Sequence, residues 1–285
     1  MAQGAEGVLI ATGELKSGKA PKDDRKFRRK IAALCFAQHF FLEARYGDHH
    51  VWVLDLPFIY KDWPSIQIAK ANPGQIDTLI KLSEGRLEEK HREQLGQAVT
   101  HAAAYTEKAH AMLSQAQPGN RAWEIAKRWF ADEETSDAML QKFIGEMMSG
   151  LRKFINVLRS NKIVLLDHPQ LRGKIMTQDD RDLFEAEAFV FKGNDPVSAI
   201  YIQQVLFKEN PIVKGPRNFA RLLVHEIAHR ELKTEDHKSA TNGIKPTKGR
   251  LPFAQTCNNS DSWAFCVMDL ADMLTPLEIA RARII

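Results

Sequence analysis

The sequence predicts an α+β protein that is mostly helical and carries a small antiparallel hairpin. Apolar residues recur at spacings of three and four over long segments between residues 92 and 160, which is typical of amphipathic helices. Two short runs, 189–191 and 199–202, are instead rich in β-branched and aromatic residues and are separated by the turn-forming sequence GNDP, which indicates two strands. A hydrophobic content of 44% with 27% charged residues is ordinary for a globular protein of 285 residues.

We divide the chain into an accessory N-terminal region of unassigned role, residues 1–84, and a larger domain, residues 85–285. The accessory region is expected to be helical, with a first helix that begins near residue 22. The apolar run over residues 31–42 is too short to cross a bilayer, so it predicts a core helix and no membrane insertion. Residues 46–60 have the β-branched and aromatic content of a strand.

Further helices follow from the same periodicity. They are expected over residues 72–87, 92–113, 121–131 and 138–160. The sequence QPGN contains the helix breakers Pro and Gly and separates the second of these helices from the third. A closing helix is expected over residues 260–274, capped by Ser260 or Asp261.

Charge and cysteine content limit the classes of partner and the site of synthesis. A formal charge of +4 implies no strong attraction to nucleic acid, so no nucleic-acid partner is expected. Three cysteines are too few for a disulfide framework, and the first residues lack the basic start and apolar core of a signal peptide. We therefore expect synthesis in the cytoplasm and, for a secreted protein, export by a non-classical route, as for a bacterial effector or toxin.

The segment RLLVHEIAHR, residues 221–230, carries the strongest chemical signal in the chain. His225 and His229 are four residues apart, so on a helix both imidazoles face the same side and can reach one Zn²⁺ at about 2.0–2.1 Å. Glu226 stands where metalloproteases keep the carboxylate that takes a proton from a zinc-activated water. The alternative is a buried helix with two hydrogen-bonded histidines and no metal.

A zinc ion bound by two histidines needs a third protein ligand, which leaves the fourth position for water. Asp236 follows His229 by seven residues and reaches the metal if the chain turns back after the helix. A thermolysin-like arrangement takes the acidic ligand from a later helix instead, and Asp261 is then the candidate. The metzincin arrangement is excluded, because Leu232 and Glu235 occupy the glycine and histidine positions of that pattern.

The segments HEIAH, TEDH and NNSDSWAF together resemble the aspzincins, the family of deuterolysin and peptidyl-Lys metalloendopeptidase. The residues that match the second and third motifs of that family are Thr234, Asp236, Asn259, Asp261, Trp263 and Phe265. The resemblance implies a zincin-like metallopeptidase domain over residues 85–285, with Zn²⁺ bound by His225, His229 and Asp236. It also implies cleavage of a protein or peptide on the N-terminal side of lysine, with Asp261 receiving the lysine ammonium group.

The second motif departs from the family pattern. The substituted positions are Lys233 for Gly, Ser239 for Tyr and Ala240 for Gly. The tyrosine is implied to stabilise the oxyanion, so its absence leaves that role to another donor. We assign the role to His237 and therefore count it as catalytic, with Lys238 as the alternative.

The predicted function is that of a zinc metalloendopeptidase. If the protein is an effector, an immunity protein or a secretion-system protein is a further expected partner. Two alternatives stay open. A peptidoglycan-directed metallopeptidase would use the same chemistry on cell-wall peptides. A catalytically inactive zinc-binding module is also consistent with the residue at the tyrosine position, Ser239.

Overall fold

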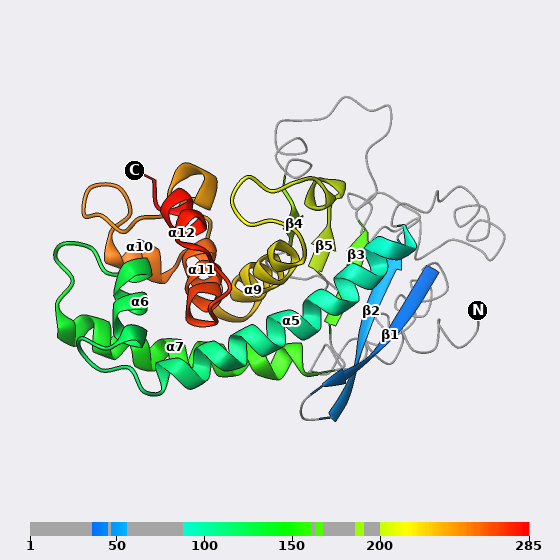
Figure 1. The fold of residues 1–285 in the computed structure, drawn as a ribbon, viewed down its shortest axis with the longest axis horizontal. Coiled ribbons are helices and arrows are strands. Elements are labelled where there is room, and N and C mark those ends of the chain that lie inside the picture. The colour runs from blue at the N-terminus through cyan, green and yellow to red at the C-terminus, as the bar shows by residue number, and fades with distance from the viewer. Residues whose placement is uncertain are drawn as a thin grey trace, which may run out of the picture. The chain divides into compact units, whose positions relative to one another are not determined.

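The computed structural model describes residues 36–44, 47–55, 88–160, 163–167, 186–190 and 200–284 (Figure 1). These residues are mostly helical and include one β-sheet, so the predicted α+β class is confirmed. The chain divides into two compact units, Met1–Gln97 with Ser160–Lys208, and Ala98–Arg159 with Glu209–Ile285. The chain thus passes between the units more than once, whereas the division predicted after residue 84 has a single boundary.

The sheet belongs to the first unit and has five strands in the order β1-β2-β3-β5-β4 (Figure 1). The strands are β1 Phe36–Ala44, β2 Gly47–Asp55, β3 Ile163–Asp167, β4 Ala188–Phe189 and β5 Ile200–Ile202. The outer pairs, β1 with β2 and β4 with β5, are antiparallel, and β3 pairs in parallel with β2 and with β5. The predicted antiparallel hairpin corresponds to β4 and β5, which form one edge of a larger mixed sheet.

The core helix predicted over residues 31–42 is wrong in its described part, because the chain from Phe36 onward forms strand β1. Short apolar runs fit a helix and a strand equally well by periodicity alone. Here all 9 residues of β1 have a partner in β2, and this pairing between strands decides the conformation. Strand β2 confirms the strand predicted within residues 46–60. The helices predicted near residue 22 and over 72–87 lie outside the described residues.

The second unit contains most of the described helices. They are α6 Arg121–Phe130, α7 Asp137–Leu158, α9 Pro216–Leu232, α10 Phe253–Cys257, α11 Ser260–Leu270 and α12 Pro276–Ala282, with the short 3-10 helix η3 Ala240–Asn242. Helix α5, Glu89–Leu113, begins in the first unit and continues into the second, and η2, Gln204–Phe207, belongs to the first. The helices predicted between residues 92 and 160 are confirmed. None of the helices in the described ranges is long and apolar enough to span a bilayer.

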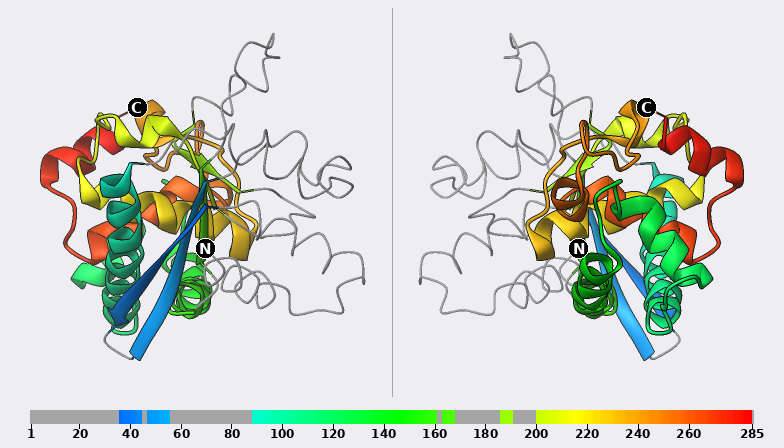
Figure 2. Two further views of the ribbon diagram at one scale, coloured as in Figure 1. Left: turned by 90° about the vertical axis from the view of Figure 1, so that its right-hand side faces the viewer. Right: turned by 90° about the vertical axis from the view of Figure 1, so that its left-hand side faces the viewer.

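An aromatic cluster around Trp263 of α11 forms the core of the second unit. The Trp263 ring centroid lies 5.9 Å from that of Phe130 in α6 and 5.8 Å from those of Phe143 and Phe154 in α7. Such edge and tilted ring pairs are favourable contacts. Helix α11 also packs against α9, which carries the HEIAH segment (Figures 1 and 2). The aromatic core therefore holds α11 in place, and α11 in turn packs against the helix of the candidate site, α9.

Gly150 allows α7 to come close to the ends of α9 and α11. A Cβ atom at this position would lie 2.9 Å from Cη2 of Trp263 and 3.2 Å from Cδ1 of Leu232. The Trp263 ring has little freedom to move, because it is buried between other rings. Gly145 lies on the exposed side of the same helix, and no heavy atom lies within 4 Å of the position of its Cβ.

We predict opposite effects for the same substitution at these two glycines. Gly150→Ala should lower the free energy of unfolding by about 1–3 kcal/mol, because the added methyl group overpacks the contact with Trp263. Gly145→Ala should raise it by about 0.5–1 kcal/mol, because alanine favours the helix and has space. Thermal unfolding followed by circular dichroism measures both changes. An increase in stability for both variants would show that α7 is not held at this distance.

Candidate metal centre

Helix α9 orients both histidines of the HEIAH segment. Gly215 precedes it with φ 63°, a left-handed conformation that favours glycine, and Pro216 occupies the first turn, where no backbone N–H is required. Five apolar residues of this helix are buried: Ala220, Leu223, Val224, Ile227 and Ala228. His225 and His229 are four residues apart, so they project from the same side of this buried helix.

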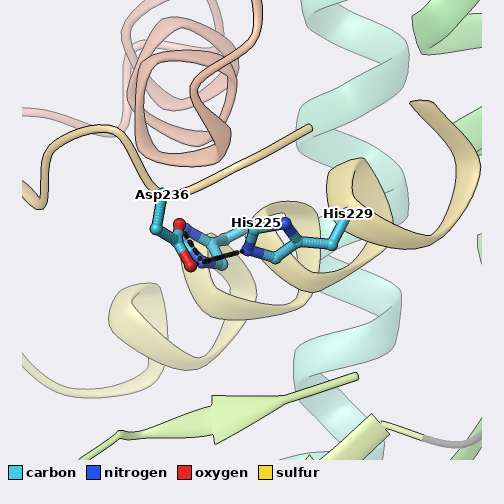
Figure 3. A group of neighbouring side chains, drawn as sticks. All are labelled: His225, His229 and Asp236. Carbon is cyan, nitrogen blue, oxygen red and sulfur yellow. Dashed lines mark hydrogen bonds and ion pairs between the residues drawn. The ribbon is translucent and has the colours of Figure 1, made fainter. Parts of the chain in front are cut away.

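The structure brings the three predicted metal ligands, His225, His229 and Asp236, together, and we call these three residues the metal group. His225 and His229 project from α9 toward Asp236, which lies on the chain that follows the helix (Figure 3). The two Nε2 atoms are 3.1 Å apart, and the carboxylate oxygens of Asp236 lie 3.3 Å from Nε2 of His225 and 3.1 Å from Nε2 of His229. Ligands of a tetrahedral zinc at about 2.0–2.1 Å are separated by about 3.3–3.4 Å. The two nitrogens are thus close to the spacing of two corners of such a site, and Asp236 brings a different carboxylate oxygen near that spacing from each of them.

The hydrogen bonds of the far ring nitrogens determine what the Nε2 atoms present to each other. Nδ1 of His229 lies 2.8 Å from the carbonyl oxygen of Thr234, which can only accept, so this nitrogen carries the proton. Nδ1 of His225 lies 2.8 Å from Oδ1 of Asp261 and donates to that carboxylate in the same way. In the neutral rings both Nε2 atoms therefore present lone pairs at 3.1 Å, and such lone pairs repel unless a cation or a proton lies between them. This donor arrangement fits a metal ion.

The turn after α9 explains how Asp236 reaches the two histidines. The helix ends at Leu232, and Lys233 adopts a left-handed conformation with φ 61° that reverses the chain. The backbone N–H of Glu235 then donates to the Asn258 carbonyl oxygen at 2.7 Å, and the N–H of Ser260 donates to the Glu235 carbonyl oxygen at 3.0 Å. These two bonds attach the returning chain to the start of α11. They hold the residue that follows Glu235 beside α9.

Asp261 supports His225 and is not placed to bind the metal or a substrate. Its Oδ1 accepts hydrogen bonds from Nδ1 of His225 at 2.8 Å and from Nη1 of Arg221 at 3.0 Å, and its Oδ2 accepts the backbone N–H of Ala240 at 2.7 Å. The substrate-binding role predicted for Asp261 is therefore corrected, because the side chain is 7% exposed and both oxygens are engaged. The thermolysin-like alternative fails for the same reason, since the carboxylate faces the nitrogen of His225 that lies away from Asp236.

Asp261 is also not the cap of its helix. The N-cap of α11 is Asn259, and neither Ser260 nor Asp261 precedes the first turn, as one of them was predicted to do. Asn259 instead holds the returning chain, because its Oδ1 accepts the backbone N–H of Lys238 at 3.0 Å while its Nδ2 donates to Oγ of Ser262 at 3.1 Å. The side chains of Asn259 and Asp261 thus bind the turn next to the site and do not cap the first turn of α11.

The ion pair between His225 and Asp261 shifts the pKa values of both groups. Burial disfavours the charged form of His225, but the attraction and hydrogen bond of Asp261 outweigh burial and raise the pKa of His225 to about 9. Burial alone would raise the pKa of Asp261, and the charges of His225 and Arg221 together with the Ala240 N–H hold it far below its ordinary value instead. Asp261 is therefore an anion in the folded protein.

Glu226 is buried next to the three ligand atoms. The residue is 1% exposed, its Oε1 lies 4.0 Å from Nε2 of His225, and its Oε2 has no hydrogen-bond partner among the described residues. Burial raises the pKa of this carboxyl group, although His225 and His229 act in the opposite direction. A buried carboxylate oxygen without a donor is unfavourable, so the site is built for a further group that can donate to it.

The other predicted catalytic residue, His237, lies on the turn that carries Asp236. Its Nε2 is 3.3 Å from Nδ2 of Asn258 and 4.0 Å from Oε2 of Glu235. The oxyanion role of His237 stays a prediction, because these contacts do not involve a member of the metal group. Ser239, at the tyrosine position of the second motif, has its Oγ 2.9 Å from Oγ1 of Thr241.

Sequence reasoning did not identify Arg221 as part of the site. Arg221 lies one turn before His225 on α9, so it and His225 project from the same face and both reach Asp261. The signal was present in the spacing of four residues, which is the same rule that identified the two histidines. The rule alone does not reveal that a carboxylate from another helix lies between these two side chains.

Comparisons with known proteins do not assign the chain to a family. No protein-family model matches the sequence, and no curated protein matches it. The aspzincin resemblance therefore stays a prediction from the three segments that carry it, and the interpretation of the site depends on its geometry.

We predict that Lys233→Gly stabilises the protein. Lysine in the left-handed region is strained, and glycine at this position relieves that strain, so the free energy of unfolding should rise by up to about 1 kcal/mol. Ala131→Gly is the control, because Ala131 follows α6 with φ −86° and glycine there should only lower stability. Chemical denaturation of both variants measures the two changes. A loss of stability in Lys233→Gly would contradict the conformation given to this turn.

Proposed function

We propose that the protein is a zinc-dependent metalloendopeptidase with a zincin-like catalytic domain. The observation that carries the proposal is the convergence of the His225, His229 and Asp236 ligand atoms beside the buried carboxylate of Glu226. Two imidazoles and one carboxylate are a donor set that suits zinc and leaves one position free. The resemblance of HEIAH, TEDH and NNSDSWAF to the aspzincins supports the same function.

The metal and the protein contribute different parts of the chemistry. When bound, Zn²⁺ polarises a carbonyl group and lowers the pKa of a water molecule. Glu226 acts as the general base that takes a proton from the attacking water at a carboxylate oxygen. It then returns this proton to the nitrogen of the leaving amine.

The proposed substrate is a protein or peptide, with no lysine pocket assigned to Asp261. The oxygens of Asp261 accept three hydrogen bonds from the protein itself. A preference for cleavage before lysine would need another carboxylate near the site. An effector that leaves the cell by a non-classical route is the proposed biological setting.

We predict one bound zinc ion per chain. After dialysis against zinc and then metal-free buffer, metal analysis should find the ion in the wild type and should not find it in His229→Ala or Asp236→Ala, because each variant removes one of three ligands. His237→Ala is the matched control on the same turn and should keep its zinc. Zinc retained by Asp236→Ala at the wild-type level would contradict the proposed ligand set.

We predict that Glu226→Gln keeps the fold and the zinc but loses hydrolysis. The amide cannot accept the proton of water, so turnover of a denatured protein mixture should fall by roughly 10²–10⁴-fold. Glu231→Gln on the same helix is the control and should keep its activity. New peptide termini detected by mass spectrometry, with and without a chelator, measure the reaction.

The same experiment separates the alternatives. Zinc binding with no cleavage of proteins by the wild type, but cleavage of short branched cell-wall peptides, would favour a peptidoglycan-directed metallopeptidase. Zinc binding with no cleavage of either substrate would favour an inactive zinc-binding module, as Ser239 at the tyrosine position allows.

A further inference from the structure

We infer that Asp261, paired with Arg221, is the positioning residue of the metal centre, and that it holds the His225 ring and the turn carrying Asp236 at the same time. The inference rests on the proposed zinc site and assigns a role to a residue that binds neither metal nor substrate. Three contacts carry it: the hydrogen bond to His225, the ion pair with Arg221 and the hydrogen bond to Ala240.

The contact with His225 fixes which nitrogen is free for the metal. Asp261 accepts from Nδ1 of His225 at 2.8 Å, so in the neutral ring the one proton is on Nδ1 and the lone pair is on Nε2. Nε2 is the atom that lies 3.1 Å from His229 and 3.3 Å from Asp236. The carboxylate thus sets both the tautomer and the orientation of the imidazole.

Arg221 makes it possible to bury this carboxylate. Its guanidinium group lies 3.0 Å from Oδ1 of Asp261, and both side chains are almost fully buried, with 6% and 7% exposed. Arg221 is itself held in place, because its Nε donates to Oδ1 of Asn218 at 2.8 Å and its guanidinium carbon lies 5.6 Å from the centre of the Phe265 ring. The guanidinium group thus lies in a fixed position beside the carboxylate oxygen that also contacts His225.

The second oxygen of Asp261 links α9, which carries His225 and His229, to the turn that carries Asp236. Oδ2 of Asp261 accepts the backbone N–H of Ala240 at 2.7 Å, and Ala240 lies four residues after Asp236 on the same turn. Asn259 holds this turn at Lys238 in addition. One carboxylate of α11 therefore contacts the helix that supplies two ligands and the turn that supplies the third.

An ionised carboxylate is required in this position, because all three partners are donors. In Asp261→Asn one of the two oxygens becomes an amide NH₂ group, which faces either Ala240 N–H or the donors on the side of His225 and Arg221. In the second orientation His225 can relieve the contact between donors by moving its proton to Nε2, the nitrogen that the metal needs. In the first orientation the turn loses its hydrogen bond.

The test compares zinc affinity in two variants that each replace a buried aspartate of α11. Asp261→Asn should bind zinc 10–100-fold more weakly than the wild type in competition with a chromophoric chelator. Asp269→Asn is the matched control: Asp269 is 6% exposed and accepts from Arg128 and Trp129 of α6 at 2.6 and 2.8 Å. It should lower the melting temperature and leave the zinc affinity unchanged, which separates positioning from general destabilisation.

A second measurement uses the zinc-loaded wild type and needs no variant. Nitrogen-15 spectra of its histidine rings should show His225 bound through Nε2 with a hydrogen-bonded proton on Nδ1. If the wild type binds no zinc, the proposed function fails and the inference fails with it. If the wild type binds zinc and Asp261→Asn binds it equally well, or if His225 lacks the Nδ1 proton, the inference alone is overturned.

Discussion

The packing of α11 against α9 is the constraint on which the metal group depends. Helix α9 supplies both imidazoles, but the groups that fix them come from α11 and the turn attached to it. Asp261 holds the ring of His225, and Oγ of Ser260 lies 3.0 Å from Nδ1 of His229. The backbone of Ser260 also holds the carbonyl of Glu235. A helix alone can place two histidines on one face, but only a packed neighbour restricts their rotamers enough to bring three ligand atoms together.

The balance of charge at the site gives a reason for a cation that is independent of the distances between ligands. Arg221 offsets the charge of Asp261, and within the described part of the chain no second buried guanidinium or ammonium group forms an ion pair with Glu226 or Asp236. Glu226 and Asp236 thus leave an excess of negative charge at the site. The imidazole of His225 can take a proton and so neutralise part of this negative charge, as its raised pKa indicates. A divalent ion bound at the Nε2 atoms would neutralise the same negative charge without the added proton on His225, because histidines bind a metal as neutral rings.

The parts of the fold that follow from local spacing were predictable from the sequence. The HEIAH helix and the helices between residues 92 and 160 follow from the periodicity of apolar residues, and the return of Asp236 follows from the distance along the chain. Strand β1 was missed because its conformation depends on pairing with β2, which no local pattern reveals. The role of Asp261 was missed for a similar reason. Motif comparison shows that a carboxylate is present at this position, but which atom it faces depends on how two helices pack.

The position of Asp261 also restricts where substrate selectivity can arise. A carboxylate that accepts from His225, Arg221 and Ala240 cannot also receive a substrate cation without releasing one of them, and each release would disturb a ligand of the metal group. The Asp236 side chain is 59% exposed, so the site is open to solvent on the side of the turn after α9. In the proposed peptidase, the side chains that select a substrate would lie on that open side. The buried face of the site is occupied by the contacts that orient the imidazoles, whereas Lys233 and Ser239, two positions that depart from the aspzincin pattern, lie on the turn.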